Sequence, residues 1–132
     1  MTARTASCSC GALSVLYHGE PVRVSICHCL DCQRRTGSAF SVNARFNRAD
    51  VSASGPAHTF TRRGDSGKMI TFHFCPSCGS TVYWTLDAFP GVIAVAAGAF
   101  AGTTFPAPRV SVYESRALVW VQLPGTITEH HG

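Results

Sequence analysis

The sequence has few charged residues and almost no lysine. Charged residues make up 14% of its 132 residues, against about 25% in an average globular chain. This low share argues against a disordered chain, a charged tail or a coiled coil. Lys68 is the single lysine, and the other ten basic residues are arginines, which suit fixed contacts with carboxylates or phosphates. The formal net charge of +4 is weak evidence for a nucleic-acid partner, which needs a denser basic patch, and we expect none.

Long apolar runs are also missing. The longest weakly polar run, residues 91–102, is shorter than the roughly 20 residues that cross a membrane. Residues 1–6 lack the apolar segment of a secretory signal. We therefore expect one cytoplasmic domain with no membrane partner. Its expected bounds are 8–123, between tails at 1–7 and 124–132.

Helix signals are scarce, and the pattern predicts a mainly β fold with little helix. Short runs with period-2 alternation are separated by glycine and proline. They cover residues 13–17, 22–26, 40–46 and 70–74, with further strand candidates at 81–85, 92–95 and 109–113. The best helix candidate is residues 31–35, which end before Gly37. We expect Tyr83 and Trp84 in the core.

Cysteine, in contrast, is abundant. The seven cysteines form three groups: Cys8-Ser9-Cys10, then Cys27-His28-Cys29-Leu30-Asp31-Cys32, then Cys75-Pro76-Ser77-Cys78. An odd number cannot close entirely into disulfides, and disulfides do not suit the cytosol. Ligation of metal by thiolates fits both facts.

The spacing of the groups predicts two zinc sites. A C-x-C pair in extended chain and a C-x-x-C turn can each place two sulfurs on one ion. The first and third groups would supply a closed set of four ligands to a structural zinc: Cys8, Cys10, Cys75 and Cys78. The second group, Cys27, Cys29 and Cys32, would leave one coordination position open, as catalytic zinc sites do.

An alternative makes all seven cysteines structural, with His28 or an outside group completing the second site. Adjacent residues of an extended chain point opposite ways, so His28 is a poorer ligand than Cys27 and Cys29. A redox role for Cys29 and Cys32 is disfavoured because a reactive C-x-x-C usually starts a helix in a βαβ unit.

At these residues the sequence resembles the glutathione-dependent formaldehyde-activating enzyme (Gfa) family, also called the CENP-V/GFA domain. The resemblance covers residues 8–123 and includes all three cysteine groups. Its other parts are Gln33-Arg34-Arg35-Thr36-Gly37-Ser38-Ala39-Phe40, Gly64-Asp65-Ser66-Gly67, Ala97-Gly98-Ala99-Phe100 and Trp120.

The resemblance implies an Mss4-like (β-tent) fold built around zinc, with the same division of the seven cysteines. It also implies a carbon–sulfur lyase or synthase that joins glutathione to formaldehyde. The partners would then be a small thiol and an aldehyde, and the oligomeric state is left open.

Arginines near the second site would suit the two carboxylates of glutathione. Arg34 and Arg35 are the first candidates because they directly follow the second group. The alternative is that they are solvated or pair with Asp31 or Asp65. For the whole protein, the alternatives are a zinc-stabilised binding module without catalysis and an enzyme for a different thiol adduct.

Overall fold

A computed structural model describes residues 3–132 and contains mostly β-strands. The strands are β1 (Ala3–Ser7), β2 (Ser14–His18), β3 (Arg23–Cys27), β4 (Ser41–Asn47), β5 (Val51–Ser54), β6 (His58–Arg63), β7 (Met69–Phe74), β8 (Thr81–Leu86), β9 (Val92–Ala96), β10 (Val110–Val112) and β11 (Glu129–His130). The helices are α1 (Leu30–Thr36) and the short 3₁₀ turns η1 (Arg48–Asp50), η2 (Ala97–Phe100) and η3 (Glu114–Arg116). The expected mainly β fold with little helix is confirmed.

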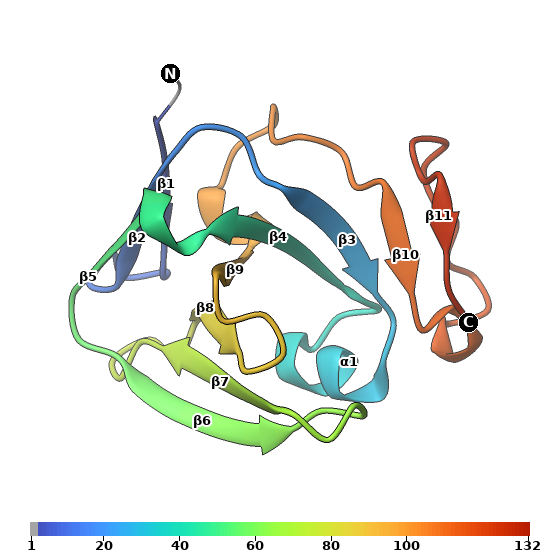
Figure 1. Ribbon diagram of the computed structural model, residues 1–132, viewed down its shortest axis with the longest axis horizontal. Coiled ribbons are helices and arrows are strands. Elements are labelled where there is room, and N and C mark those ends of the chain that lie inside the picture. The colour runs from blue at the N-terminus through green and yellow to red at the C-terminus, as the bar shows by residue number, and fades with distance from the viewer. Residues whose placement is uncertain (1–2) are drawn as a thin grey trace.

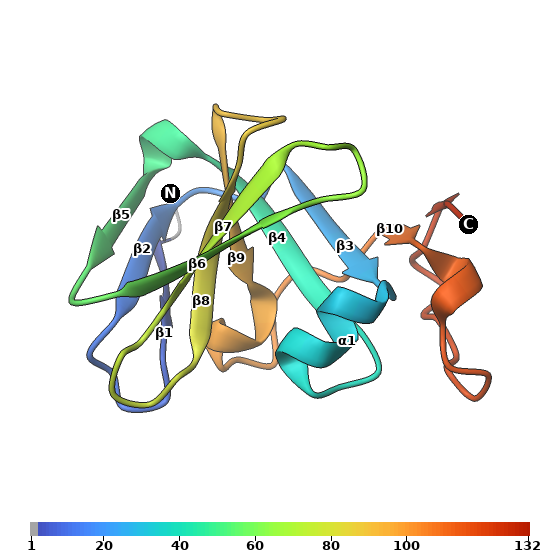
Figure 2. The ribbon, with the colours of Figure 1, turned by 90° about the horizontal axis from the view of Figure 1, so that it is seen from below.

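The strands form two sheets. The larger has eight strands in the order β11-β10-β3-β4-β9-β8-β7-β6, and the smaller has three in the order β1-β2-β5. The small sheet lies at one end of the molecule, whereas α1 and β10 lie towards the other (Figures 1 and 2). All pairings are antiparallel except those of β10 with β3 and β11.

The two faces of the large sheet have different neighbours. Ala44 and Phe46 of β4 and Val95 of β9 are fully buried in the main core, together with Val15 and Tyr17 of the small sheet. The alternate residues point to the opposite face, as period 2 requires. There Phe72, Trp84 and Ala94 form a second, smaller cluster. The second face of the large sheet therefore has its own apolar cluster, separate from the main core.

Helix α1 has a cap at each end. The sulfur of Cys29 accepts a hydrogen bond from the backbone N–H of Cys32 at 3.2 Å, which satisfies one of the free donors of the first turn. Gly37 ends the helix in the left-handed conformation, at φ 65°. The basic residues Arg34 and Arg35 lie in the last turn, where positive charge is favoured. The helix predicted over residues 31–35 is confirmed.

Parts of both expected tails form strands. Met1 and Thr2 lie outside the described residues, but residues 3–7 pair with β2 and bury Ala6 completely. At the other end β11 pairs with β10, and Ile127 is buried. Segments of both expected tails therefore pack with the rest of the chain. The less exposed residues of β1 are Arg4 and Ala6, which form no apolar alternation that could be recognised in the sequence.

None of the helices in residues 3–132 has the length and apolar character needed to span a bilayer.

Candidate metal centres and the adjoining pocket

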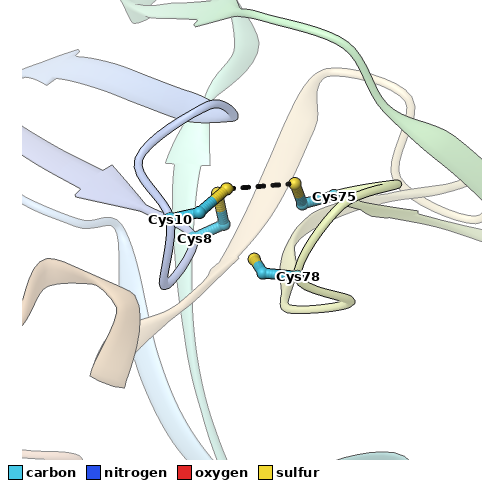
Figure 3. A group of neighbouring side chains, drawn as sticks. All are labelled: Cys8, Cys10, Cys75 and Cys78. Carbon is cyan, nitrogen blue, oxygen red and sulfur yellow. Dashed lines mark hydrogen bonds between the residues drawn. The ribbon is translucent and has the colours of Figure 1, made fainter.

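The first and third cysteine groups meet at one place. Cys8 and Cys10 lie in the turn after β1, and Cys75 and Cys78 lie in the turn after β7 (Figure 3). The four sulfurs are all within 4.8 Å of one another. Cys10 Sγ is 3.7 Å from Cys8 Sγ and 3.6 Å from Cys75 Sγ. We call these residues the four-cysteine site.

Backbone N–H groups donate hydrogen bonds to these sulfurs. The N–H of Leu13 donates to Cys8 Sγ at 3.2 Å. Hydrogen bonds from the side chain and backbone of Ser80 lower the pKa of Cys78 to about 5. A backbone hydrogen bond from Ala12 would lower the pKa of Cys10, but neighbouring sulfurs outweigh it and raise that pKa to about 11. The surroundings thus favour thiolate, while four crowded sulfurs cannot all ionise without a cation.

The second group forms a local cluster, the three-cysteine site. Cys27 ends β3, Cys29 caps α1, and Cys32 lies in the first turn of that helix. Their sulfurs are also within 4.8 Å of one another, and Cys27 and Cys32 are buried. Hydrogen bonds from Cys27 and Cys29 lower the pKa of Cys32 to about 2. Hydrogen bonding to Cys29 and Cys32, together with burial, raises the pKa of Cys27. One cysteine of the cluster thus ionises easily while its neighbours resist ionisation, because adjacent thiolates repel one another. A bound cation would remove this repulsion.

Both groups could hold a metal ion, and their donor sets contain only sulfur. Thiolate ligands select thiophilic metals such as Zn²⁺, and four of them match its tetrahedral preference. Three thiolates would fill three of the four coordination positions of Zn²⁺ and leave the fourth open. The residues present therefore fit zinc at both sites.

His28 faces away from the three-cysteine site. Its ring is fully buried, and its Nε2 lies 3.0 Å from the hydroxyl oxygen of Ser111 on β10. Burial lowers the pKa of His28, so the ring is neutral at pH 7. His28 is not among the residues whose ligand atoms the structure brings together at this site. Its ring packs instead beside Ser111 and Phe40.

A cavity of about 260 Å³ adjoins the three-cysteine site. All three cysteines of that site line the cavity, whereas the four-cysteine site contributes no residue to it. Four arginines also line it: Arg23, Arg35, Arg45 and Arg62. The cavity therefore combines a sulfur cluster with positive charge.

Of the two arginines expected near this site, only Arg35 lines the cavity. Its guanidinium lies over the rings of Trp84, at 4.5 Å, and Phe72, at 4.9 Å from the ring centroids. Arg34 instead lines a neighbouring hollow beside Phe60 and Phe74. Trp84 is buried, as expected of a core residue, but it also forms part of the cavity wall.

The expected partner of Asp31 also differs. Asp31 pairs with Arg62 of β6 at 3.3 Å, rather than with an arginine of its own helix. This ion pair connects α1 to the hairpin on the far side of the cavity.

Four other cavity residues were missed in the sequence. Arg23 precedes Cys27 by four positions on one strand, so the alternation that places Cys27 on this face also places Arg23 there. The position of Arg23 on this face could therefore have been predicted from the sequence. Arg45 alternates with the buried Ala44 and Phe46, so the period of β4 also places it on this face. Arg62 reaches the cavity from β6, at the edge of the large sheet, which no local pattern indicates. Tyr113 does so from a left-handed backbone conformation, at φ 57°, for which the sequence holds no cue.

Comparison with known proteins agrees with this geometry. A family model described as "Glutathione-dependent formaldehyde-activating enzyme" matches residues 3–116. The chain is similar to a Rhodobacter sphaeroides protein whose crystal structure comes from Northeast Structural Genomics, with 19% identity and a TM-score of 0.57. The match covers 76% of this chain and 90% of that chain, and at this identity it shows the fold alone. No curated protein matches the chain.

Proposed function

This chain belongs to the glutathione-dependent formaldehyde-activating enzyme family, and from that premise we propose that it is a zinc-dependent carbon–sulfur lyase or synthase. The match confirms the family resemblance found in the sequence, and the mainly β structure fits the Mss4-like fold of that family. One observation carries the proposal: the three-cysteine site opens into a cavity lined by arginines, and the four-cysteine site does not contribute to that cavity.

The two sites would hold zinc for different purposes. Cys8, Cys10, Cys75 and Cys78 would be the ligands of a structural ion, and Cys27, Cys29 and Cys32 those of a functional ion. When bound at the functional site, Zn²⁺ would offer its open position to a thiol and favour the thiolate form of that thiol. We place the protein in the cytoplasm, whose reducing conditions keep thiols free.

The proposed reaction adds glutathione to formaldehyde. The sulfur forms a bond to the carbonyl carbon, the carbon–oxygen π bond breaks, and the thiol proton ends on the oxygen. The product is S-hydroxymethylglutathione, with no oxidant or reductant required. The same groups catalyse the reverse reaction, in which the carbon–sulfur bond breaks and the aldehyde is released.

The residues of the cavity have separate parts in this proposal. The three cysteines fix the place where the substrate sulfur lies. Arg35, held by its contacts with Trp84 and Phe72, offers charge to a substrate carboxylate. Burial and a hydrogen bond to Asp65 raise the pKa of Tyr113, so its hydroxyl stays protonated in the cavity wall and can donate to a substrate oxygen.

Calorimetric titration of the zinc-loaded protein with glutathione tests this function. We expect glutathione to bind, S-methylglutathione to bind much more weakly because its sulfur is blocked, and a Cys29→Ser variant to lose the difference. Equal binding of both ligands by the wild-type protein would show that the sulfur does not reach the metal. Binding of neither would remove glutathione as the substrate.

The alternative function is a zinc-stabilised binding module. One observation favours it: Val119 and Trp120 are adjacent apolar side chains that are 101% and 68% exposed. Such a module would bind neither glutathione nor other thiols. An enzyme for a different thiol would instead bind that thiol, with the same dependence on Cys29.

A further inference from the structure

Two arginines lie side by side in the cavity, away from the cysteines. Arg23 of β3 and Arg45 of β4 are direct cross-strand partners, as are Ser25 with Asn43 and Cys27 with Ser41. Partners opposite each other share a face of the sheet, so the arginines lie on the same face as Cys27. Four residues of extended strand separate Arg23 from Cys27, which corresponds to about 13 Å.

Neither of these two arginines forms an ion pair within residues 3–132, although Asp31 and Asp65 line the same cavity. Among residues 3–132, the acidic groups that form ion pairs do so with Arg4, Arg62, His130 and His131. Glu129 experiences the charge of Arg23, but its carboxylate pairs with His131 at 3.0 Å. Arg23 and Arg45 therefore face each other as like charges, which is unfavourable unless an anion joins them.

Polar atoms beside the pair also lack partners. Arg23 Nε and Asn43 Oδ1 are buried and make no hydrogen bond within residues 3–132. Burial, and then the charge of Arg23, lower the pKa of Arg45. A buried donor without a partner is costly, and it marks a place where a bound group is expected to supply one.

The surroundings hold Arg45 in place and leave room beside it. Its guanidinium lies over the ring of Phe89, 4.7 Å from the centroid. A stacked guanidinium keeps the N–H groups at its edge available for two parallel hydrogen bonds. The next residue across the sheet is Ala94, followed by Trp84. The small alanine side chain leaves space between the arginine pair and the aromatic wall.

We propose that Arg23 and Arg45 form a carboxylate-binding subsite that selects long thiol substrates carrying a carboxylate remote from the sulfur. The assignment of the sulfur end rests on the proposed function. With the sulfur at the three-cysteine site, the γ-glutamyl carboxylate of glutathione extends towards the arginine pair. A short thiol such as 2-mercaptoethanol reaches only the cysteine end. The subsite thus sets which thiol the enzyme accepts.

The test uses the full-length protein loaded with Co²⁺, whose absorption reports a thiol at the metal. Glutathione and its diethyl ester, in which both carboxylates are blocked, are titrated into the wild type. Arg45→Met, Arg23→Met and the exposed control Arg48→Met are titrated in parallel. Calorimetry of the same titrations measures binding that does not involve the metal. Neither cavity variant should weaken the fold, because each removes one of two like charges.

We expect the wild type to bind glutathione about tenfold to a hundredfold more tightly than the ester, as for charge-assisted hydrogen bonds worth roughly 1.5–3 kcal/mol. Arg45→Met and Arg23→Met should lose most of this preference for the acid and keep only the part that Arg35 contributes, and Arg48→Met should behave as the wild type.

The outcomes separate the two proposals. Equal affinity of the wild type for the acid and the ester, with a changed cobalt spectrum, would overturn the subsite and keep the thiol function. Heat of binding that is lost in Arg45→Met, with an unchanged spectrum, would keep the subsite and overturn the thiol function. No heat and no spectral change would overturn both.

Discussion

The two cysteine sites are built from the same ligand type but in opposite ways. The four-cysteine site joins turns that are far apart in the chain, with Cys10 and Cys75 separated by 65 residues. The three-cysteine site is local, since all its sulfurs come from Cys27–Cys32. An ion at the first site would close a long loop of chain, whereas one at the second would leave the chain connectivity almost unchanged.

The surroundings of the two cysteine sites also differ. The four-cysteine site ties the small sheet to the β7–β8 turn and adjoins no part of the cavity described here. The three-cysteine site lies at the junction of β3 and α1 and forms part of a cavity wall. This contrast supports the proposal that the first site serves stability and the second serves chemistry. In that proposal, identical ligands serve different purposes according to the sequence separation that they bridge.

The largest effect is expected from Cys78→Ser. Cys78 is exposed, so its loss removes a ligand without leaving a cavity in the core. Metal binding at such a site is folding energy, about 10–16 kcal/mol in small zinc domains, which is comparable to the whole stability of a domain. We expect loss of the cooperative thermal transition, measured by circular dichroism. A folded variant with the melting temperature of the wild type would contradict the structural role of the four-cysteine site.

Cys29→Ser should abolish thiol binding while the fold is kept. Serine can replace the sulfur that accepts from the Cys32 N–H, because its hydroxyl is also a good helix cap. The zinc content, measured by atomic emission, should fall from two ions per chain to one. The melting temperature should move by only a few degrees. Unfolding as complete as that of Cys78→Ser would mean that both sites are structural.

Two glycines next to the two sites sharpen the contrast further. At Gly55, φ is +99° and a Cβ would lie 1.8 Å from the carbonyl oxygen of Ala12, in the four-cysteine turn. At Gly37, which ends α1, φ is +65° and a Cβ would meet no atom within 4 Å. We expect Gly55→Ala to cost about 3 kcal/mol and Gly37→Ala about 1 kcal/mol, measured by urea unfolding. Equal costs would show that the turn at Ala12 can move.

The smallest effect is a pH dependence near the three-cysteine site. Burial would raise the pKa of Glu114, but hydrogen bonds from His130 and Ser111 outweigh it and lower that pKa below its usual 4.5. The unfolded chain therefore takes up this proton at a higher pH than the folded chain, so this stabilisation is lost as the pH falls below about 4.5. Glu114→Gln should make the melting temperature fall less steeply with pH in that range. A variant with an unchanged slope would count against this account.

Much of the fold could be predicted from local patterns. Period-2 alternation identified β2, β3, β4 and β7, because apolar side chains alternate along each strand and point to one face of its sheet. The run before Gly37 identified α1. The spacing of the cysteines grouped the seven sulfurs as the structure does, since C-x-C and C-x-x-C bring two sulfurs together locally.

What could not be predicted depends on long-range arrangement. β1 carries only small and polar residues, and it is recognisable as a strand only through its pairing with β2. Arg62 reaches the cavity from β6, and only the order of strands in the large sheet shows that β6 lies at its edge. Tyr113 reaches the cavity through an unusual backbone conformation of a non-glycine residue.

The division of labour between the two sites can be tested by metal release to an excess of a colorimetric chelator, followed together with circular dichroism. We predict two phases of equal amplitude. In the fast phase one zinc ion leaves the three-cysteine site while the spectrum is unchanged. In the slow phase the second ion leaves the four-cysteine site as the fold is lost. Release of both ions in one phase, at the rate of unfolding, would contradict the account.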